Sequence, residues 1–233
     1  MKVLKNPPII EVLLQINYEP SLDITSEFST KLVSTFAAFK SEPISQIQIA
    51  PNAQPVISAY GNKFSDASTG EVIQITKEFL AYSTTAKYDN WESFSKRGLD
   101  NVSMFLGQLA PANINRVALR YVNRIEIEDE LRNVGRYLKV YPTFGEVLSN
   151  KIENSILQFS SFFSEYDARA NIILRIDKTT DEKFVVFLDI DAFIMGQFKP
   201  TREDINIESE KLRAIKNVIF KDCLTEVLLA SFN

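Results

Sequence analysis

Arginine recurs at every fourth position in one segment of the sequence, and this spacing is its most distinctive chemical feature. Arg116, Arg120 and Arg124 lie within residues 115–127, where polar and apolar residues alternate most regularly. Side chains four residues apart on a β-strand point to the same face, roughly 13 Å apart at about 3.3 Å per residue. A guanidinium group can hold a carboxylate or a phosphate through two parallel hydrogen bonds. The segment therefore predicts a strand with one cationic face.

Apolar residues occupy the alternate positions of the same segment and predict its buried face. These positions hold Val117, Leu119, Tyr121, Ile125 and Ile127, with Asn123 the one polar member. Three other segments, 9–18, 169–178 and 183–194, alternate in the same way and predict further strands. If these strands join one sheet, its polar face collects charged residues from all of them. The candidate binding residues are Arg116, Arg120, Arg124, Arg169, Arg175, Glu11, Asp189 and Asp191.

Three kinds of chemistry are open to this charged face. Arginines beside carboxylates on neighbouring strands would form cross-strand ion pairs with no further role. On a concave face, the arginines would instead bind a partner, a small anion or RNA. Asp189 and Asp191, about 6.6 Å apart between Cα atoms, could hold Mg²⁺ together with Glu11 and water, as an RNA- or nucleotide-processing enzyme would require. No spacing fixes a further ligand, so we expect no metal and no cofactor.

Composition excludes several classes of enzyme. The sequence has no histidine, which removes histidine-based acid–base and nucleophile systems and histidine-ligated metals. The single cysteine, Cys223, lies in an amphipathic helical pattern and is expected to be a buried structural thiol. The seven glycines form no dinucleotide- or phosphate-binding loop. We therefore favour a non-enzymatic protein and assign no catalytic residue.

Charge and hydropathy bear on partners and location. A formal net charge of −4 does not favour non-specific binding to nucleic acid, although a local basic patch stays open. Pro7, Pro8 and Glu11 interrupt any signal-peptide core, and no apolar run reaches membrane-spanning length. We expect a cytoplasmic protein that does not associate with membranes.

The order of predicted elements indicates an α+β protein with largely antiparallel sheets and helices packed on one face. Residues 1–127 form an N-terminal β-α-β-β-α-β half, ferredoxin-like in element order, with Asp23 as the N-cap of its first helix. Residues 128–150 are expected to be a structured connection. Residues 151–233 form a C-terminal β-β-β-α half, and the two halves could be one continuous domain.

Aromatic residues have two expected positions. Trp91 is expected to anchor the helix at 90–109 in the core, since Phe94 follows at helical spacing. The phenylalanine-rich stretch 159–163 is expected to lie in the core or in a protein interface.

Several short segments carry a family resemblance. They are Pro8-Ile9-Ile10-Glu11-Val12, the run from Arg116 to Ile125, the run from Tyr88 to Phe94, and Leu224-Thr225-Glu226. Together they resemble a sporadically distributed, uncharacterised bacterial family with a P-I-x-E-V start and an R-x-x-L-R-Y-x-N-R-I strand. The resemblance covers nearly the whole chain and implies one shared architecture, with no specific activity. Sporadic distribution is typical of accessory or antiphage defence genes.

These observations lead to one functional expectation and one alternative. We expect a binding or assembly component of a bacterial system that uses the arginine-lined sheet face, with a protein partner or a homo-oligomer as its main association. An anionic ligand or RNA is the second kind of partner. The alternative is the metal-dependent RNA- or nucleotide-processing enzyme, with the same arginines on phosphate.

Overall fold

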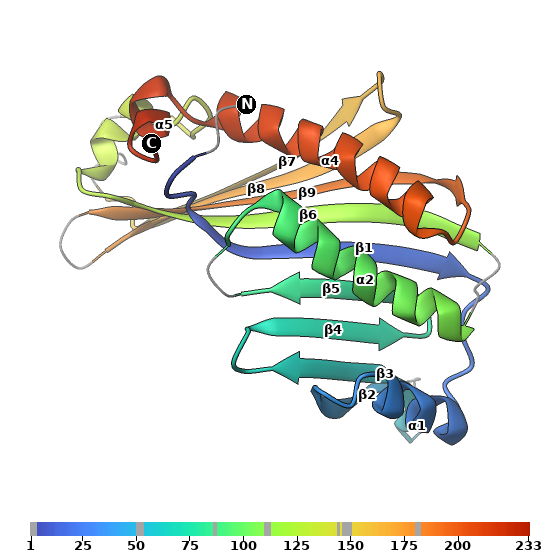
Figure 1. Ribbon diagram of the computed structural model, residues 1–233. Helices are drawn as coiled ribbons and strands as arrows, with labels where there is room; N and C mark the ends of the chain where they lie inside the picture. The colour runs from blue at the N-terminus through green and yellow to red at the C-terminus, as the bar shows by residue number, and fades with distance from the viewer. Residues whose placement is uncertain are drawn as a thin grey trace. The chain divides into compact units, whose positions relative to one another are not determined.

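The protein is α+β, as the sequence predicts, with helices packed against an antiparallel sheet (Figure 1). A computed structural model describes residues 4–49, 54–85, 88–109, 113–143, 145, 151–179 and 183–233. Its strands are β1 (Ile9–Glu19), β2 (Lys40–Gln48), β3 (Val56–Asp66), β4 (Glu71–Thr76), β5 (Phe79–Thr84), β6 (Asn113–Ile127), β7 (Asn154–Phe163), β8 (Ala168–Lys178) and β9 (Phe184–Phe198). Its helices are α1 (Ser26–Thr35), α2 (Trp91–Leu109), α4 (Arg202–Cys223), α5 (Glu226–Ala230) and the 3₁₀ helix η1 (Leu131–Arg136). Hydrogen bonding orders the strands β2-β3-β4-β5-β1-β6-β9-β8-β7.

Several element boundaries differ from the sequence prediction, most of them by one or two residues. The N-cap of α1 is Thr25, not Asp23, because the Thr25 hydroxyl accepts a hydrogen bond from the Phe28 N–H at 3.1 Å. Strand β9 continues to Phe198, beyond the predicted end at residue 194. Within the described residues, no helix combines the length and the apolar character needed to cross a membrane.

Contacts divide the chain into two compact units, each assembled from separate stretches. Unit 1 comprises the described residues of Met1–Val12, Leu119–Ile194 and Glu210–Asn233. Unit 2 comprises those of Leu13–Ala118 and Met195–Ser209. The halves that the sequence suggests, 1–127 and 151–233, stay a prediction.

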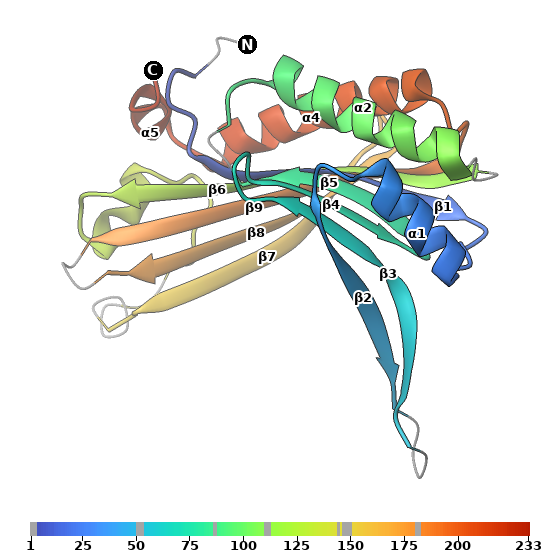
Figure 2. The same ribbon diagram turned by 60° about the horizontal axis from the view of Figure 1, so that its bottom comes forward.

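Unit 2 packs α1 and α2 against one side of its strands (Figure 2). Aromatic pairs join helix to sheet: Phe36 with Phe64, Tyr82 with Phe94, and Tyr18 with Phe105, with ring centroids 5.0–5.4 Å apart. Trp91 is buried beside Phe94, as predicted. On β3, Gly61 is required because a Cβ there would lie 2.1 Å from the Ile75 carbonyl oxygen of β4.

Unit 1 buries the apolar face of β6 under α4. All six predicted core positions in β6 are buried, five of them in unit 1 and Val117 in unit 2. They include Asn123, whose side-chain N–H donates to the Leu188 carbonyl at 2.9 Å. That bond satisfies a polar group that would otherwise be costly to bury. Cys223 is a buried free thiol, as predicted, and burial raises its pKa to about 11. The part of the predicted connection that is described includes η1 and the buried Leu138, whereas residues 144 and 146–150 lie outside the described residues.

Candidate functional site

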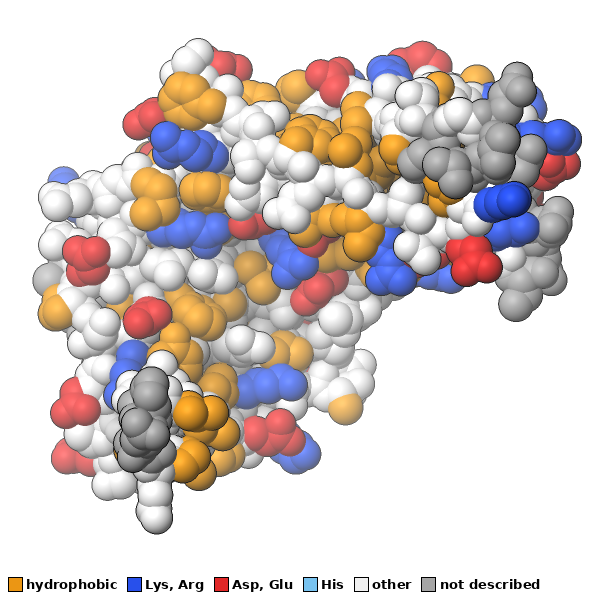
Figure 3. Space-filling model, turned by 180° about the vertical axis from the view of Figure 1, so that it is seen from behind, with side chains coloured by type: hydrophobic (Ala, Val, Ile, Leu, Met, Phe, Trp, Pro, Cys, Tyr) orange, Lys and Arg blue, Asp and Glu red, His pale blue; other side chains and the backbone are white. Residues whose placement is uncertain are grey.

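In unit 1, one face of β7, β8 and β9 lies opposite the helix-covered side, and side chains on this face form cross-strand rows. From strand register, the rows are Phe162–Arg169–Phe193, Ser160–Asn171–Asp191, Gln158–Ile173–Asp189, Ile156–Arg175–Phe187 and Asn154–Asp177–Val185. We call these residues, together with Glu11 of β1 and Arg120, Arg124 and Glu126 of β6, the open face. Figure 3 shows the molecule from behind, where Lys and Arg side chains are interleaved with hydrophobic and acidic ones. The open face is therefore mixed in character and not a continuous basic surface.

Arg120 lies at the centre of a group of carboxylates. Its guanidinium donates two hydrogen bonds to Asp189, from Nε at 2.8 Å and from Nη2 at 2.6 Å. Hydrogen bonding to Asp189, with the negative charges of Asp189, Glu11 and Asp191, raises the pKa of Arg120 above its ordinary value although partial burial opposes this. The structure thus brings together four of the eight predicted site residues: Arg120, Glu11, Asp189 and Asp191.

The other predicted arginines have separate settings. Arg124 forms an ion pair with Glu126 of the same strand, and Arg175 pairs with Asp177 at 2.9 Å. Arg116 belongs to unit 2, where it is half-buried. Cross-strand ion pairing, one of the interpretations open from the sequence, describes the Arg120–Asp189 pair, which joins β6 to β9. The pairs of Arg124 and Arg175 each lie within a single strand.

Arg169 and Arg175 also stack on aromatic rings. The Arg169 guanidinium carbon lies 5.3 Å from the ring centroid of Phe162, and that of Arg175 lies 5.8 Å from the centroid of Phe187. A guanidinium over an aromatic face is attracted by the ring quadrupole and keeps its outward edge available for a partner. Between residues of known placement, Arg169 has no carboxylate partner. Arg169 is therefore the arginine of the open face best able to bind a carboxylate of another molecule.

The metal-site hypothesis meets an obstacle at Asp189. Both of its carboxylate oxygens already accept hydrogen bonds from Arg120, which places a positive charge where a cation would have to bind. In the described part of the chain, no three His, Cys, Asp or Glu side chains are grouped so that they could hold a metal ion.

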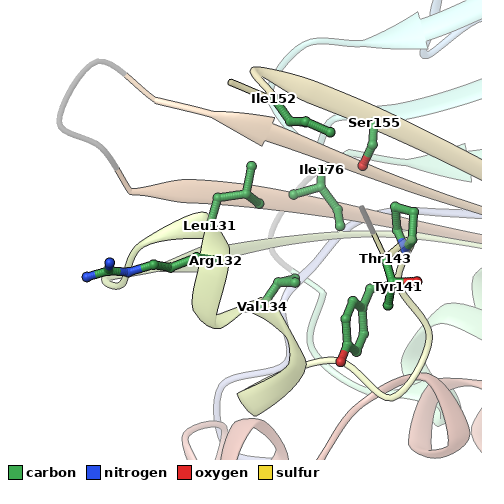
Figure 4. Close-up of a pocket in the computed structure, with 9 residues that line it drawn as sticks. Leu131, Arg132, Val134, Tyr141, Thr143, Ile152, Ser155 and Ile176 are labelled. Atoms are coloured by element: carbon green, nitrogen blue, oxygen red, sulfur yellow. The ribbon is translucent and has the colours of Figure 1, made fainter. Parts of the chain in front are cut away.

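A second feature of unit 1 is a small cavity between η1 and the strands β7 and β8. It measures about 180 Å³ and is lined largely by Leu131, Val134, Ile152 and Ile176, with the hydroxyl-bearing residues Tyr141 and Ser155 at its side (Figure 4). Arg132 extends away from it in Figure 4 and pairs with Glu130 at 2.6 Å. Among the described residues that line this cavity, no charged group is directed into it, so these residues offer it no acid–base or anion-binding chemistry.

Gly135 fixes the wall of that cavity. A Cβ at this position would lie 2.4 Å from the Tyr141 hydroxyl oxygen. Only glycine lets the tyrosine lie this close to η1. The cavity is therefore a consequence of how the connection packs.

Sequence reasoning missed the aromatic half of the open face. Phe187 alternates with buried residues on β9, and Phe162 alternates with half-buried residues on β7. Their stacking on arginines depends on strand register, which the sequence does not specify. The phenylalanine-rich stretch was a signal, since Phe162 is 57% exposed and Ile156 is 66% exposed. Exposed apolar side chains of this size on one face of one strand indicate an interface more than a core.

Lys216 is a titratable residue that the sequence pattern did not single out. It is half-buried on α4, with its Nζ 4.1 Å from the ring centroid of Tyr121 on β6. Burial, with the positive charge of Arg213, lowers the pKa of Lys216 from 10.5 to about 8. The folded protein therefore holds this lysine charged at neutral pH at a cost in stability, which the contact with the Tyr121 ring partly offsets.

The variant Lys216→Met is expected to be more stable than the wild type at pH 7, by about 2 kcal/mol. The folded-state pKa lies below the unfolded one, so the cost is fully present below pH 8 and disappears as pH rises from about 8 to 10.5. Urea denaturation of both proteins at pH 7 and pH 10 measures this. A stability difference that stays constant over this range would contradict the assignment.

No protein-family model matches the sequence, and a search of curated proteins finds no significant similarity.

Proposed function

We propose that this protein is a non-enzymatic binding or assembly component of a bacterial accessory or defence system, and that it recognises a protein partner through the open face of unit 1. The observation that carries the proposal is the pair of arginine–phenylalanine stacks, Arg169 on Phe162 and Arg175 on Phe187. Arginine and aromatic residues are enriched where protein interfaces concentrate their binding energy.

Charge on the open face favours a polypeptide over a phosphate polymer. The face carries four arginines against five carboxylates. The arginines are Arg120, Arg124, Arg169 and Arg175, and the carboxylates are Glu11, Glu126, Asp177, Asp189 and Asp191. Binding to RNA or DNA depends on neutralising many phosphates, and these carboxylates would oppose it. A partner with both charged and apolar side chains matches this mixture better.

Apolar exposure on the same face supports this choice. Ile156 and Phe162 are more than half exposed, and each lies in a row with one of the stacked arginines. Covering such side chains on binding removes apolar surface from water, worth about 25 cal/mol per Å² before the costs of association.

Replacing both stacked arginines is expected to remove the partner while leaving the fold intact. The variant Arg169→Ala/Arg175→Ala and the wild type would be used for affinity capture from native lysate, with and without nuclease, followed by identification of captured protein and nucleic acid. Both arginines are exposed, so the melting temperature should change little. We expect a protein that the wild type captures and the variant does not, with no effect of nuclease.

The matched control is Arg132→Ala/Arg136→Ala, which removes two exposed arginines of η1 from the same unit. This control should capture the partner as the wild type does. Equal capture by all three proteins would contradict the proposal, and capture that nuclease abolishes would favour the RNA alternative.

A further inference from the structure

Strand β7 ends the sheet order, and its outer edge has no strand paired to it among the described residues. An edge strand exposes backbone N–H and C=O groups that can pair with another chain. Which residues of β7 do so follows from one hydrogen bond. The Lys178 N–H donates to the Glu153 carbonyl at 2.7 Å, so this cross-strand pair is of the hydrogen-bonded type.

Hydrogen-bonded and non-hydrogen-bonded pairs alternate along an antiparallel ladder. Residues at odd numbers in β7 therefore bond to β8, and residues at even numbers direct their backbone groups to the free edge. The even residues are Asn154, Ile156, Gln158, Ser160 and Phe162, which are also the β7 residues of the open face. Five consecutive outward positions are available for pairing.

Strand β7 lacks the features that usually protect such an edge. All ten of its residues are uncharged, it contains no proline, and its register with β8 runs without a shift from Asn154 to Phe163. The strand at the other end of the sheet order, β2, differs in each respect. It carries Lys40, Glu42 and Pro43 and a register shift between Ile44 and Ser45. Charges, proline and bulges are the means by which natural proteins block edge pairing.

We propose that β7 pairs with β7 of a second copy of this chain, antiparallel and centred on Phe159. This register places Ile156 opposite Phe162 of the partner copy, and Gln158 opposite Ser160 of that copy. Because the two-fold axis repeats each pair, the exposed apolar side chains meet each other twice and polar side chains meet polar ones. An uncharged strand meets its own copy without like-charge repulsion, which makes a second copy the fitting occupant.

The pairing goes beyond the proposed function, since it depends on the backbone edge and not on the arginines. It would extend the rows of the open face across the two-fold axis, so that a row reading Phe187–Arg175–Ile156 continues into Phe162 and Arg169 of the second copy. The stacked arginines of both copies would then lie on one continuous face.

Cysteine pairs test the register in purified protein. In the variant Gln158→Cys/Ser160→Cys, each new thiol lies opposite one in the second copy, at a separation that a disulfide can bridge. We expect a covalent dimer on mild oxidation. In the single variants Gln158→Cys and Ser160→Cys, identical positions would lie about 8 Å apart and should not crosslink. The native Cys223 is buried and should not interfere.

A second measurement perturbs the edge without touching the ladder to β8. Ser160→Pro removes an outward N–H, and the matched variant Ser160→Ala keeps it. Sedimentation equilibrium should show a dimer for the wild type and for Ser160→Ala. For Ser160→Pro, we expect the dissociation constant of the dimer to be raised by roughly tenfold or more.

Three results with the wild type and the β7 variants would overturn the proposal. They are a monomeric wild type at all accessible concentrations, efficient crosslinking of a single-cysteine variant in place of the double one, and a dimer that Ser160→Pro leaves intact. Ile47→Lys, on the exposed end of β2, is the control for pairing at the other edge strand and should leave the dimer unchanged. Loss of the dimer in that variant alone would also overturn it. None of these measurements depends on partner capture, so failure here is distinct from failure of the proposed function.

Discussion

Leu119→Asp is expected to prevent the protein from folding. Leu119 has no exposed surface, and it lies on the face of β6 that unit 1 buries. A carboxylate there would lose its hydration without a cationic partner, at a cost of several kcal/mol, and the apolar contacts of the leucine would be lost as well. Because domains are stable by about 5–15 kcal/mol in total, one such change can unfold the chain. Circular dichroism and a thermal melt would show loss of a cooperative transition.

The control for this experiment is Val122→Asp, which introduces the same carboxylate three residues along the same strand. Val122 is half-buried and lies on the opposite face. A loss below about 2 kcal/mol is expected, because the carboxylate keeps access to water. Equal damage from both substitutions would contradict the assignment of faces in β6.

Arg120→Ala is expected to lower the free energy of unfolding by about 2 kcal/mol. The Asp189 side chain is only 16% exposed, and removal of its two charge-assisted hydrogen bonds leaves it beside Glu11 and Asp191. Urea denaturation of Arg120→Ala, Asp189→Ala and the double variant forms a double-mutant cycle that isolates the pair. The double variant should be less destabilised than the sum of the single variants. Additive losses would show that the two residues do not act as a pair.

The same pair allows a prediction about pH. A group whose pKa is raised on folding contributes stability that is complete below its unfolded pKa, which for arginine lies far above neutral pH, and that is lost only as pH rises through the higher folded value. The arginine's own titration therefore gives the free energy of unfolding no pH dependence between pH 6 and pH 9.

Arg124→Ala is the control for the Arg120–Asp189 double-mutant cycle, since the ion pair of Arg124 with Glu126 is exposed and should be worth less than about 1 kcal/mol.

The faces of β6 were predictable because a strand has a period of two and its core positions are all apolar except one. Asn123 shows the limit of this reasoning. Its burial follows from the alternation, but its hydrogen bond to the Leu188 carbonyl comes from a strand far along the chain. The same applies to Arg120 and Asp189, which are 69 residues apart. The sequence shows that both charged residues are present, but only the strand order shows that they are in contact.

Local signals failed where two residues offered the same chemistry. Asp23 and Thr25 are both good N-caps, and the chain uses the second. The exposed phenylalanine on β7 was ambiguous for a different reason. A strand at the end of a sheet has no neighbour to cover one side, so the same apolar sequence can be core or surface according to its position in the sheet order.

The place of β1 in the sheet has a consequence for synthesis of the protein. Strand β1 lies between β5 and β6, and β6 begins about a hundred residues later in the chain. At ribosomal rates of about 5–20 residues per second, β1 waits roughly 5–20 s for its second neighbour to be made. Until β5 is made, both edges of its alternating apolar residues, Val12 to Tyr18, are open, and one edge stays open until β6 follows. The nascent chain thus carries an unpaired apolar strand through the first half of translation, when a chaperone that binds extended apolar segments would be useful.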